Sequence, residues 1–346
     1  MQKGGRSVRP VTRRFVRHLT QRVFIGLLTV VSLATMAACS SGSRDPLGQW
    51  YQHELGLIQG IASCSPDNYC MFVGQRTGHI ALTQVYSFWE RGAWSESRPM
   101  PSVGEVLQLS CGSRESCLAI RVDDATYGFG ASAWNGYAWT KTASLPIGVA
   151  YSSCAGSNFC MVLDTDGRYG IWKPKSSSWS FGTMPGANDL SGLSCVSATF
   201  CMAIDLSGKT TVWTGDKWQS AGNAIAGFSI GTGPKGFSEL HCSSNTWCLT
   251  LGPSDSQVGM WDGKRWKLAS VPFPGVYSVS CISGPFCMAI GDSDKPYRWD
   301  GNKWIVTSGS YLPQGGQISC ASSSYCIEAG WQGTAIFAIE TPRFPY

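Results

Sequence analysis

The chain has 346 residues, a formal net charge of +5, and 14% charged residues, against about 25% in typical globular proteins. The positive charge is confined to the N-terminus, where residues 1–38 hold seven of the 27 Lys and Arg residues and none of the 22 acidic ones. The remaining 308 residues are close to neutral, with 20 basic and 22 acidic side chains. A neutral domain lacks the electrostatic footprint of a nucleic-acid-binding protein, so we expect no nucleic-acid partner.

Residues 1–38 have the organisation of an export signal. A basic region is followed by an apolar run, Val23 to Ala38, which is too short for a comfortable membrane span. The run ends in Ala37-Ala38-Cys39, which resembles the cleavage box of bacterial lipoproteins. By that resemblance, residues 1–38 are a signal peptide, Cys39 is the lipidated first residue of the mature protein, and residues 39–46 are a short tether. An ordinary signal peptide followed by a chance cysteine is the alternative.

A repeat begins at Cys64. Pairs of cysteines six residues apart occur seven times, and the first cysteines of successive pairs are 39 to 47 residues apart. An aromatic residue precedes the second cysteine in six of the seven pairs, and a pair of tryptophans follows all but the last. So specific a pattern indicates seven structural repeats. The cysteine pairs are Cys64 and Cys70, Cys111 and Cys117, Cys154 and Cys160, Cys195 and Cys201, Cys242 and Cys248, Cys281 and Cys287, and Cys320 and Cys326.

The repeat starting at Cys281 shows what each unit is expected to form. Its apolar runs are short and separated by turn residues, which predicts four strands and no helix. If Gly301 and Asn302 are the central residues of a hairpin turn, Trp299 lies directly opposite Trp304. Cysteines six residues apart face each other across a similar short hairpin, within the range of a disulfide bond. The tryptophan pairs are therefore expected to pack within the fold rather than to form sugar-stacking platforms.

The cysteine count supports both the disulfides and the lipid anchor. Fourteen of the 15 cysteines fall into the seven pairs, and Cys39 is left over. Seven disulfides would require an oxidising compartment outside the cytoplasm, and lipidation accounts for the odd cysteine. Zinc is the alternative ligand for closely spaced cysteines, but no histidine accompanies the pairs systematically. No metal and no cofactor are therefore expected.

The last repeat is incomplete, because no tryptophan hairpin follows Cys326. Residues 48–51, which include Trp50, resemble the second half of that hairpin. Trp50 precedes Cys64 by 14 residues, and Trp266 precedes Cys281 by 15. We therefore expect the N-terminal strand to be the outer strand of the last repeat, so that the two ends of the chain complete each other.

Seven four-stranded repeats of about 40 residues, closed head to tail, resemble a seven-bladed β-propeller. The Ser-Cys-x5-Cys and Trp-x-Gly-x-x-Trp signatures are similar to those of disulfide-bearing propellers of secreted bacterial proteins, particularly actinobacterial ones. The resemblance implies one all-β domain over residues 47–346, with four-stranded antiparallel blades and the N-terminal strand closing the last blade.

Candidate ligand-binding residues lie in the variable turns of the repeats and in the longest link, residues 219–241. Both are expected on the face of the propeller opposite the disulfides, since variable loops on a rigid scaffold usually carry function. Asp164 and Asp166 have a spacing that calcium ligands use, but aspartates in turns more often hydrogen-bond their own backbone. The candidates are Asp123, Asp124, Asp164, Asp166, Arg168, Phe228, Phe237 and Trp331.

Fold-level resemblance does not select a function, because propellers support many functions. No motif of an active-site nucleophile, metalloprotease or phosphate-binding loop is present in the sequence. The sequence therefore favours a membrane-anchored, extracytoplasmic lipoprotein that binds or organises a protein or glycan partner without catalysis. A glycan-acting hydrolase or lyase and a purely structural envelope protein are the alternatives.

Overall fold

The computed structural model describes residues 49–53, 57–76, 84–101, 104–122, 128–223, 240–252, 256–272, 275–282, 286–292, 295–309, 316–330 and 333–338. The chain divides into two units, residues 1–43 and residues 44–346, and every described residue belongs to the second. The predicted signal peptide and Cys39 therefore lie outside the described residues. Strands form nearly all of the regular structure, with one short 3-10 helix, η1 (Pro174–Ser176).

No helix among the described residues is long and apolar enough to cross a membrane.

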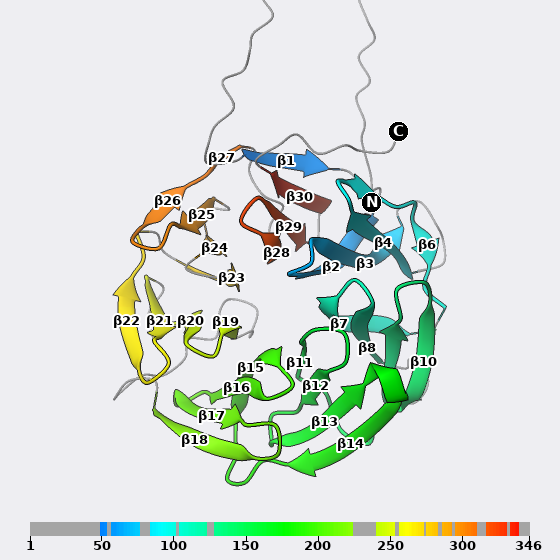
Figure 1. Ribbon diagram of the computed structural model, residues 1–346. Helices are drawn as coiled ribbons and strands as arrows, with labels where there is room; N and C mark the ends of the chain where they lie inside the picture. The colour runs from blue at the N-terminus through cyan, green and yellow to red at the C-terminus, as the bar shows by residue number, and fades with distance from the viewer. Residues whose placement is uncertain are drawn as a thin grey trace, which may run out of the picture. The chain divides into compact units, whose positions relative to one another are not determined.

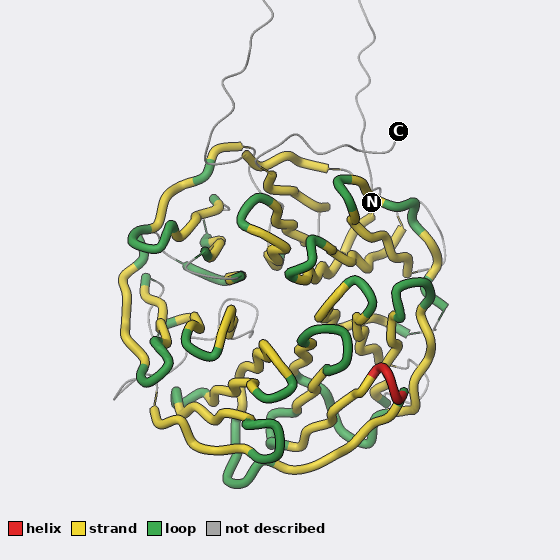
Figure 2. The backbone as a smooth tube through the Cα atoms, in the orientation of Figure 1, coloured by secondary structure: helices red, strands yellow, loops and turns green. Residues whose placement is uncertain are grey.

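Consecutive strands form six antiparallel sheets, here numbered blades 1 to 6 (Figure 1), and Figure 2 shows these strands with the turns that join them. Blade 1 contains β2 (Leu57–Ser65), β3 (Tyr69–Arg76), β4 (Gln84–Glu90) and β5 (Ala93–Trp94), with β6 (Arg98–Pro99) also paired to β4. Blade 2 contains β7 (Glu105–Ser113), β8 (Ser116–Val122), β9 (Phe129–Trp134) and β10 (Trp139–Ser144). Blade 3 contains β11 (Tyr151–Cys154), β12 (Cys160–Leu163), β13 (Arg168–Lys173) and β14 (Ser178–Thr183).

The next three blades follow the same order of strands from the inside outwards. Blade 4 contains β15 (Leu190–Ser197), β16 (Phe200–Asp205), β17 (Lys209–Trp213) and β18 (Trp218–Asn223). Blade 5 contains β19 (Leu240–Ser244), β20 (Trp247–Leu251), β21 (Gln257–Trp261) and β22 (Trp266–Ser270). Blade 6 contains β23 (Ser278–Cys281), β24 (Cys287–Ile290), β25 (Pro296–Trp299) and β26 (Trp304–Val306). An all-β propeller with four-stranded antiparallel blades is thus confirmed.

The last sheet is a composite of both ends of the propeller chain. It has three consecutive strands, β28 (Gln317–Ser322), β29 (Tyr325–Gly330) and β30 (Gly333–Ala338). The N-terminal strand β1 (Gln49–His53) pairs antiparallel with β30, and β27 (Ser308–Gly309) pairs parallel with β1. The expectation of seven equivalent blades is corrected in this respect. Six blades are continuous in sequence, whereas the last sheet needs the distant strand β1, because β30 is the last strand of the described residues.

The register of the strands follows from the short turns. In blade 6, Cys281 lies opposite Cys287, Cys287 opposite Trp299, and Trp299 opposite Trp304. Gly301, in the turn between the tryptophans, has a φ of 101°, which side chains other than glycine rarely adopt. The same row of two cysteines and two tryptophans crosses all six continuous blades.

The last sheet has an equivalent row, in which Cys320, Cys326, Phe337 and Trp50 follow one another across the strands. Trp50 therefore has the register position of the outer tryptophan, and the predicted role of β1 is confirmed. All seven predicted disulfides are formed, each between directly opposed residues with Cα atoms 3.9 to 4.1 Å apart.

The hydrophobic core lies between neighbouring blades rather than in one central cluster. The described residues form seven apolar clusters, one at each contact between successive sheets, including the contact between blade 1 and the last sheet. There Trp89 of blade 1 stacks on Tyr325, with ring centroids 4.5 Å apart and ring planes inclined by 7°. Because the chain ends pack like any other pair of neighbours, both faces of every sheet are covered.

Candidate functional site

A ring of hydrogen bonds joins the innermost strands of the blades. Figure 1 shows these strands, β2, β7, β11, β15, β19, β23 and β28, around the axis of the propeller, and each contacts the next. In six repeats a serine precedes the first cysteine, and its hydroxyl accepts a hydrogen bond from the backbone N–H of the first cysteine in the next sheet. In β19 the corresponding residue is His241.

The six serine bonds are short and regular, with N–O distances of 2.8 to 3.0 Å. They satisfy one N–H group on the inner edge of six of the seven sheets, which would otherwise lack a backbone partner. The bond from Cys64 to Ser319 joins blade 1 to the last sheet. The accepting serines are Ser63, Ser110, Ser153, Ser194, Ser280 and Ser319.

A cavity of about 490 Å³ lies inside this ring. All seven innermost strands contribute to its lining, and so do residues just after the first cysteines, such as Pro66, Gly112 and Gly156. The described cavity therefore reaches the ends of the blades that carry the disulfides. Its described lining contains no Asp, Glu, Lys or Arg, and the titratable side chains in it are Tyr151 and His241.

Leu107 is an exception to the burial of apolar side chains in the core. The register of β7 and β8 shifts between Val106 and Gln108, so Leu107 is the extra residue of a β-bulge. A bulge redirects side chains locally, and here Leu107 lines the cavity with 43% of its surface exposed. The other exposed large apolar side chains of the described residues lie outside the cavity lining.

The Cys loops and the tryptophan turns lie together at one end of each blade, here called the disulfide face. The indole N–H of Trp134 donates to the backbone carbonyl of Arg114 in the Cys loop of the same blade, at 3.0 Å. Trp213 and Trp261 make the same bond to the corresponding residues, Ala198 at 3.1 Å and Asn245 at 3.2 Å. Both kinds of turn therefore lie on the same face in these blades.

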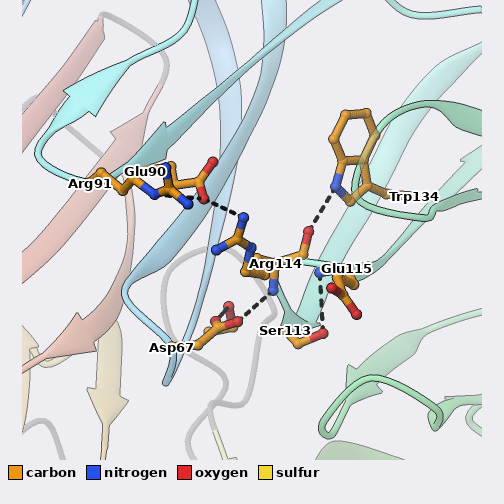
Figure 3. Close-up of polar contacts among 8 residues, drawn as sticks. Asp67, Glu90, Arg91, Ser113, Arg114, Glu115 and Trp134 are labelled. Carbon is orange, nitrogen blue, oxygen red and sulfur yellow. Dashed lines mark hydrogen bonds and ion pairs between the residues drawn. The ribbon is translucent and has the colours of Figure 1, made fainter.

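Charged side chains on the disulfide face pair with one another between blades 1 and 2 (Figure 3). Arg114 Nη2 lies 2.7 Å from Glu90 Oε1, and the backbone N–H of Arg114 donates to Asp67 Oδ2 at 2.8 Å. The Nε atom of Arg91 lies 3.7 Å from the same glutamate oxygen. These contacts hold the Cys loop of blade 2 against blade 1.

Turn aspartates on the disulfide face are held in the ionised form. The pKa of Asp262 lies well below its ordinary value, chiefly because the Lys267 side chain hydrogen-bonds the carboxylate, and backbone N–H groups add to the effect. The pKa of Asp300 is lowered mainly by the backbone N–H of Lys303. By contrast, burial raises the pKa of Tyr69 and of Tyr325, so both phenols stay neutral in the interblade core.

Three of the predicted ligand residues meet in a single turn of blade 3. Asp164 Oδ1 accepts hydrogen bonds from the backbone N–H groups of Asp166, at 3.0 Å, and Arg168, at 2.7 Å. Asp164 Oδ2 lies 2.6 Å from Arg168 Nε. These contacts stabilise the turn itself, as the alternative interpretation of the aspartates proposed. The three residues are absent from the described cavity lining, and their binding role stays a prediction.

The other five candidates, Asp123, Asp124, Phe228, Phe237 and Trp331, lie outside the described residues, as does most of the link 219–241. The expected binding site on the face opposite the disulfides therefore also stays a prediction. Within the described ranges, no group of three or more His, Cys, Asp or Glu side chains is arranged to hold a metal ion.

Sequence reasoning missed the serine ring, His241 and Leu107. The serine before each first cysteine is visible once the repeats are aligned, and so is its replacement by His241. The sequence gives no such signal for Leu107, because its exposure depends on a β-bulge that no turn residue in the sequence predicts.

No family model and no curated protein sequence matches this chain. Solved structures do match its fold. U3-55K has a TM-score of 0.59 at 12% identity, with 84% of this chain and 98% of that chain covered. YCF48 bound to D1 peptide has a TM-score of 0.61 at 11% identity, covering 84% and 97%. YCF48 from Cyanidioschyzon merolae has a TM-score of 0.56 at 13% identity, covering 84% and 98%. At these identities the similarity establishes the β-propeller fold alone.

Proposed function

We propose that this protein is a membrane-anchored, extracytoplasmic lipoprotein whose seven-bladed propeller binds or organises a protein partner without catalysis. The composite last sheet acts as the seventh blade in this proposal. The observation that carries it is the axial cavity, whose described lining comes from all seven sheets and has no Asp, Glu, Lys or Arg. Catalysis by general acid and base needs several convergent titratable groups, and the described lining offers two titratable side chains, Tyr151 and His241.

The similar structures support a protein partner rather than a glycan. One of them is YCF48 in complex with D1 peptide, which shows that a propeller of this general shape binds a polypeptide segment. Another consists of the WD40 repeats of RRP9. The disulfides and the interblade clusters tie the strands of this propeller together, which suits a surface that a protein partner contacts.

The proposed location of the protein outside the cytoplasm rests on the cysteines. Seven disulfides within hairpins suit an oxidising compartment, and Cys39 follows a signal-like segment. β1 begins at Gln49, next to Trp50 in the row that contains the last disulfide. The ten residues from Cys39 to Gly48 extend by at most about 35 Å. Because this short tether joins the propeller at the disulfide face, we expect that face to lie towards the membrane.

The proposal is tested by crosslinking and pull-down from intact cells that produce the full-length protein. We expect a defined protein to be captured at the membrane, and we expect Cys39→Ala to accumulate as unprocessed precursor. A photo-crosslinking residue at Asn302, on the disulfide face, should label membrane components more strongly than one at Lys295, at the other end of β25. A Cys39→Ala protein that is processed and membrane-bound like the wild type would refute the anchor, and the absence of any protein crosslink would refute the binding role.

A further inference from the structure

Leu107 is an apolar side chain that stays exposed to water, which costs stability. It belongs to the innermost strand of blade 2 and lines the cavity, and 43% of its surface is exposed. An apolar side chain gains stability when it is removed from water. A leucine directed into a cavity by a β-bulge therefore suggests an apolar contact made by a ligand.

The serine ring supplies hydrogen-bond donors beside this leucine. A serine hydroxyl has one proton to donate and lone pairs to accept with. Each of the six ring hydroxyls uses its oxygen to accept from a backbone N–H, and no group in the described part of the chain accepts the proton in return. The ring thus leaves several O–H donors near the cavity and complements a ligand with acceptor oxygens.

The lining also favours uncharged ligands. Because its described residues include no Asp, Glu, Lys or Arg, an ionised ligand group would lose its hydration without one of these side chains to pair with. A neutral ligand avoids this cost. The paired tryptophans of the blades are buried or half-buried and are absent from the described lining, so these residues offer no indole platform for a sugar ring in the cavity.

We propose that the axial cavity binds an uncharged, apolar segment of polypeptide, with Leu107 contacting an apolar side chain and the serine hydroxyls donating to carbonyl oxygens of the segment. This inference rests on the proposed binding function and specifies its site and ligand. A polypeptide combines carbonyl acceptors with apolar side chains in one chain, which matches the pairing of hydroxyl donors and an aliphatic contact in the cavity.

The test is a selection of displayed random heptapeptides on the detergent-solubilised mature protein, followed by affinity measurements on the selected peptides. We expect enrichment of peptides that lack Asp, Glu, Lys and Arg and contain a large apolar residue. Leu107→Asp should weaken their binding about tenfold or more, as for a central contact of an interface. Leu206→Asp is the matched control, because Leu206 is 39% exposed but lies outside the cavity lining, and it should leave binding unchanged.

Leu107→Ala is a second test variant in case Leu107→Asp does not fold. It keeps the site apolar and should weaken peptide binding by a smaller factor. Failure to enrich any peptide, enrichment of charged peptides, or equal losses in the Leu107→Asp and Leu206→Asp variants would overturn the proposal. Binding of a neutral oligosaccharide, cellohexaose, that depends on Leu107 would overturn it as well. If the crosslinked partner from intact cells is still captured by the Leu107→Asp variant, the binding function stands and the cavity is not its site.

Discussion

Blade 6 and the last sheet make the same cross-strand row in two different ways. In blade 6 a tight turn at Gly301 joins Trp299 to Trp304, so the third and fourth strands meet through local sequence. In the last sheet the outer strand β1 comes from the other end of the propeller chain. The comparison shows that the row does not require the hairpin, but its assembly in the last sheet requires closure of the whole ring.

The last sheet has contacts that compensate for the missing turn. Trp50 is 1% exposed, against 8% for Trp304, and its indole N–H donates to Thr307 Oγ1 at 3.0 Å. β1 also pairs with β27, which continues from blade 6. A tryptophan that contacts two neighbouring sheets thus takes the place of a covalent turn, and we expect the ring to open first at this point.

The largest effect is expected from removing β1. Deletion of residues 40–53 from a Cys39→Ala variant leaves β30 as an exposed edge, and such edges pair with other chains. We expect aggregation and a lower melting temperature than in the Cys39→Ala parent, measured by light scattering and calorimetry. An equally soluble truncated protein with the parent's melting temperature would contradict the role of β1 in closure.

Trp50→Ala should destabilise the protein by about 3–5 kcal/mol, the usual loss for truncating a buried tryptophan. Trp304→Ala, in blade 6, is the matched control, because it removes the same type of side chain from the equivalent row. Its cost should be smaller, since the hairpin still holds β26 in place. Urea denaturation measures both changes in the free energy of unfolding, and equal losses would show that closure adds nothing at Trp50.

Removal of the disulfide should lower the stability by the same amount in blade 6 and in the last sheet. Each disulfide closes an equally small loop, for which the loop-entropy model gives about 2 kcal/mol. We therefore expect paired Cys→Ser substitutions at Cys281 and Cys287, or at Cys320 and Cys326, to lower the stability by similar amounts. A much larger loss in the last sheet would indicate that its disulfide also supports ring closure. Urea denaturation of the two variants gives the comparison.

Thr307→Val tests the bond between the two regions and should cost about 1 kcal/mol, because it leaves the buried indole N–H of Trp50 without its acceptor. The free energy of unfolding of Thr307→Val measures this loss. In a Trp50→Phe background the same substitution should have little effect, since the indole donor is then absent. An undiminished loss in that background would assign the effect of Thr307 to its own bond with the Pro296 carbonyl instead.

The smallest effect concerns acid stability. The pKa of Asp300 is lowered from 3.8, mainly by the backbone N–H of Lys303, so its contribution is present above pH 3.8 and is lost as the pH falls through the lower pKa of the folded state. Asp300→Asn should remove this dependence in the turn of blade 6. Melting temperatures measured across the acid range should then fall less steeply for the variant than for the wild type. Parallel curves would contradict this role.

Much of the fold could be predicted because its contacts are local. Cysteines six residues apart and tryptophans on either side of a tight turn face each other whenever the hairpin forms, so spacing alone predicted these pairs. The match of Trp50 to the missing half of the last hairpin also predicted the pairing of β1. The ligand site could not be predicted in this way. The sequence pointed to turn aspartates, and the two candidates of this kind that the structure describes, Asp164 and Asp166, belong to a turn that Asp164 stabilises through its own hydrogen bonds.

The sequence by itself determined the repeat, the disulfide partners, the tryptophan pairs and the strand that completes the last sheet. Tertiary structure alone decided that the serine hydroxyls accept from the next sheet, that seven apolar clusters form between the sheets, and that a bulge turns Leu107 into the axial cavity. The physical reason is the range of the contacts: a hairpin is specified within a few residues, whereas the lining of the axis exists only after every blade has packed against its neighbours.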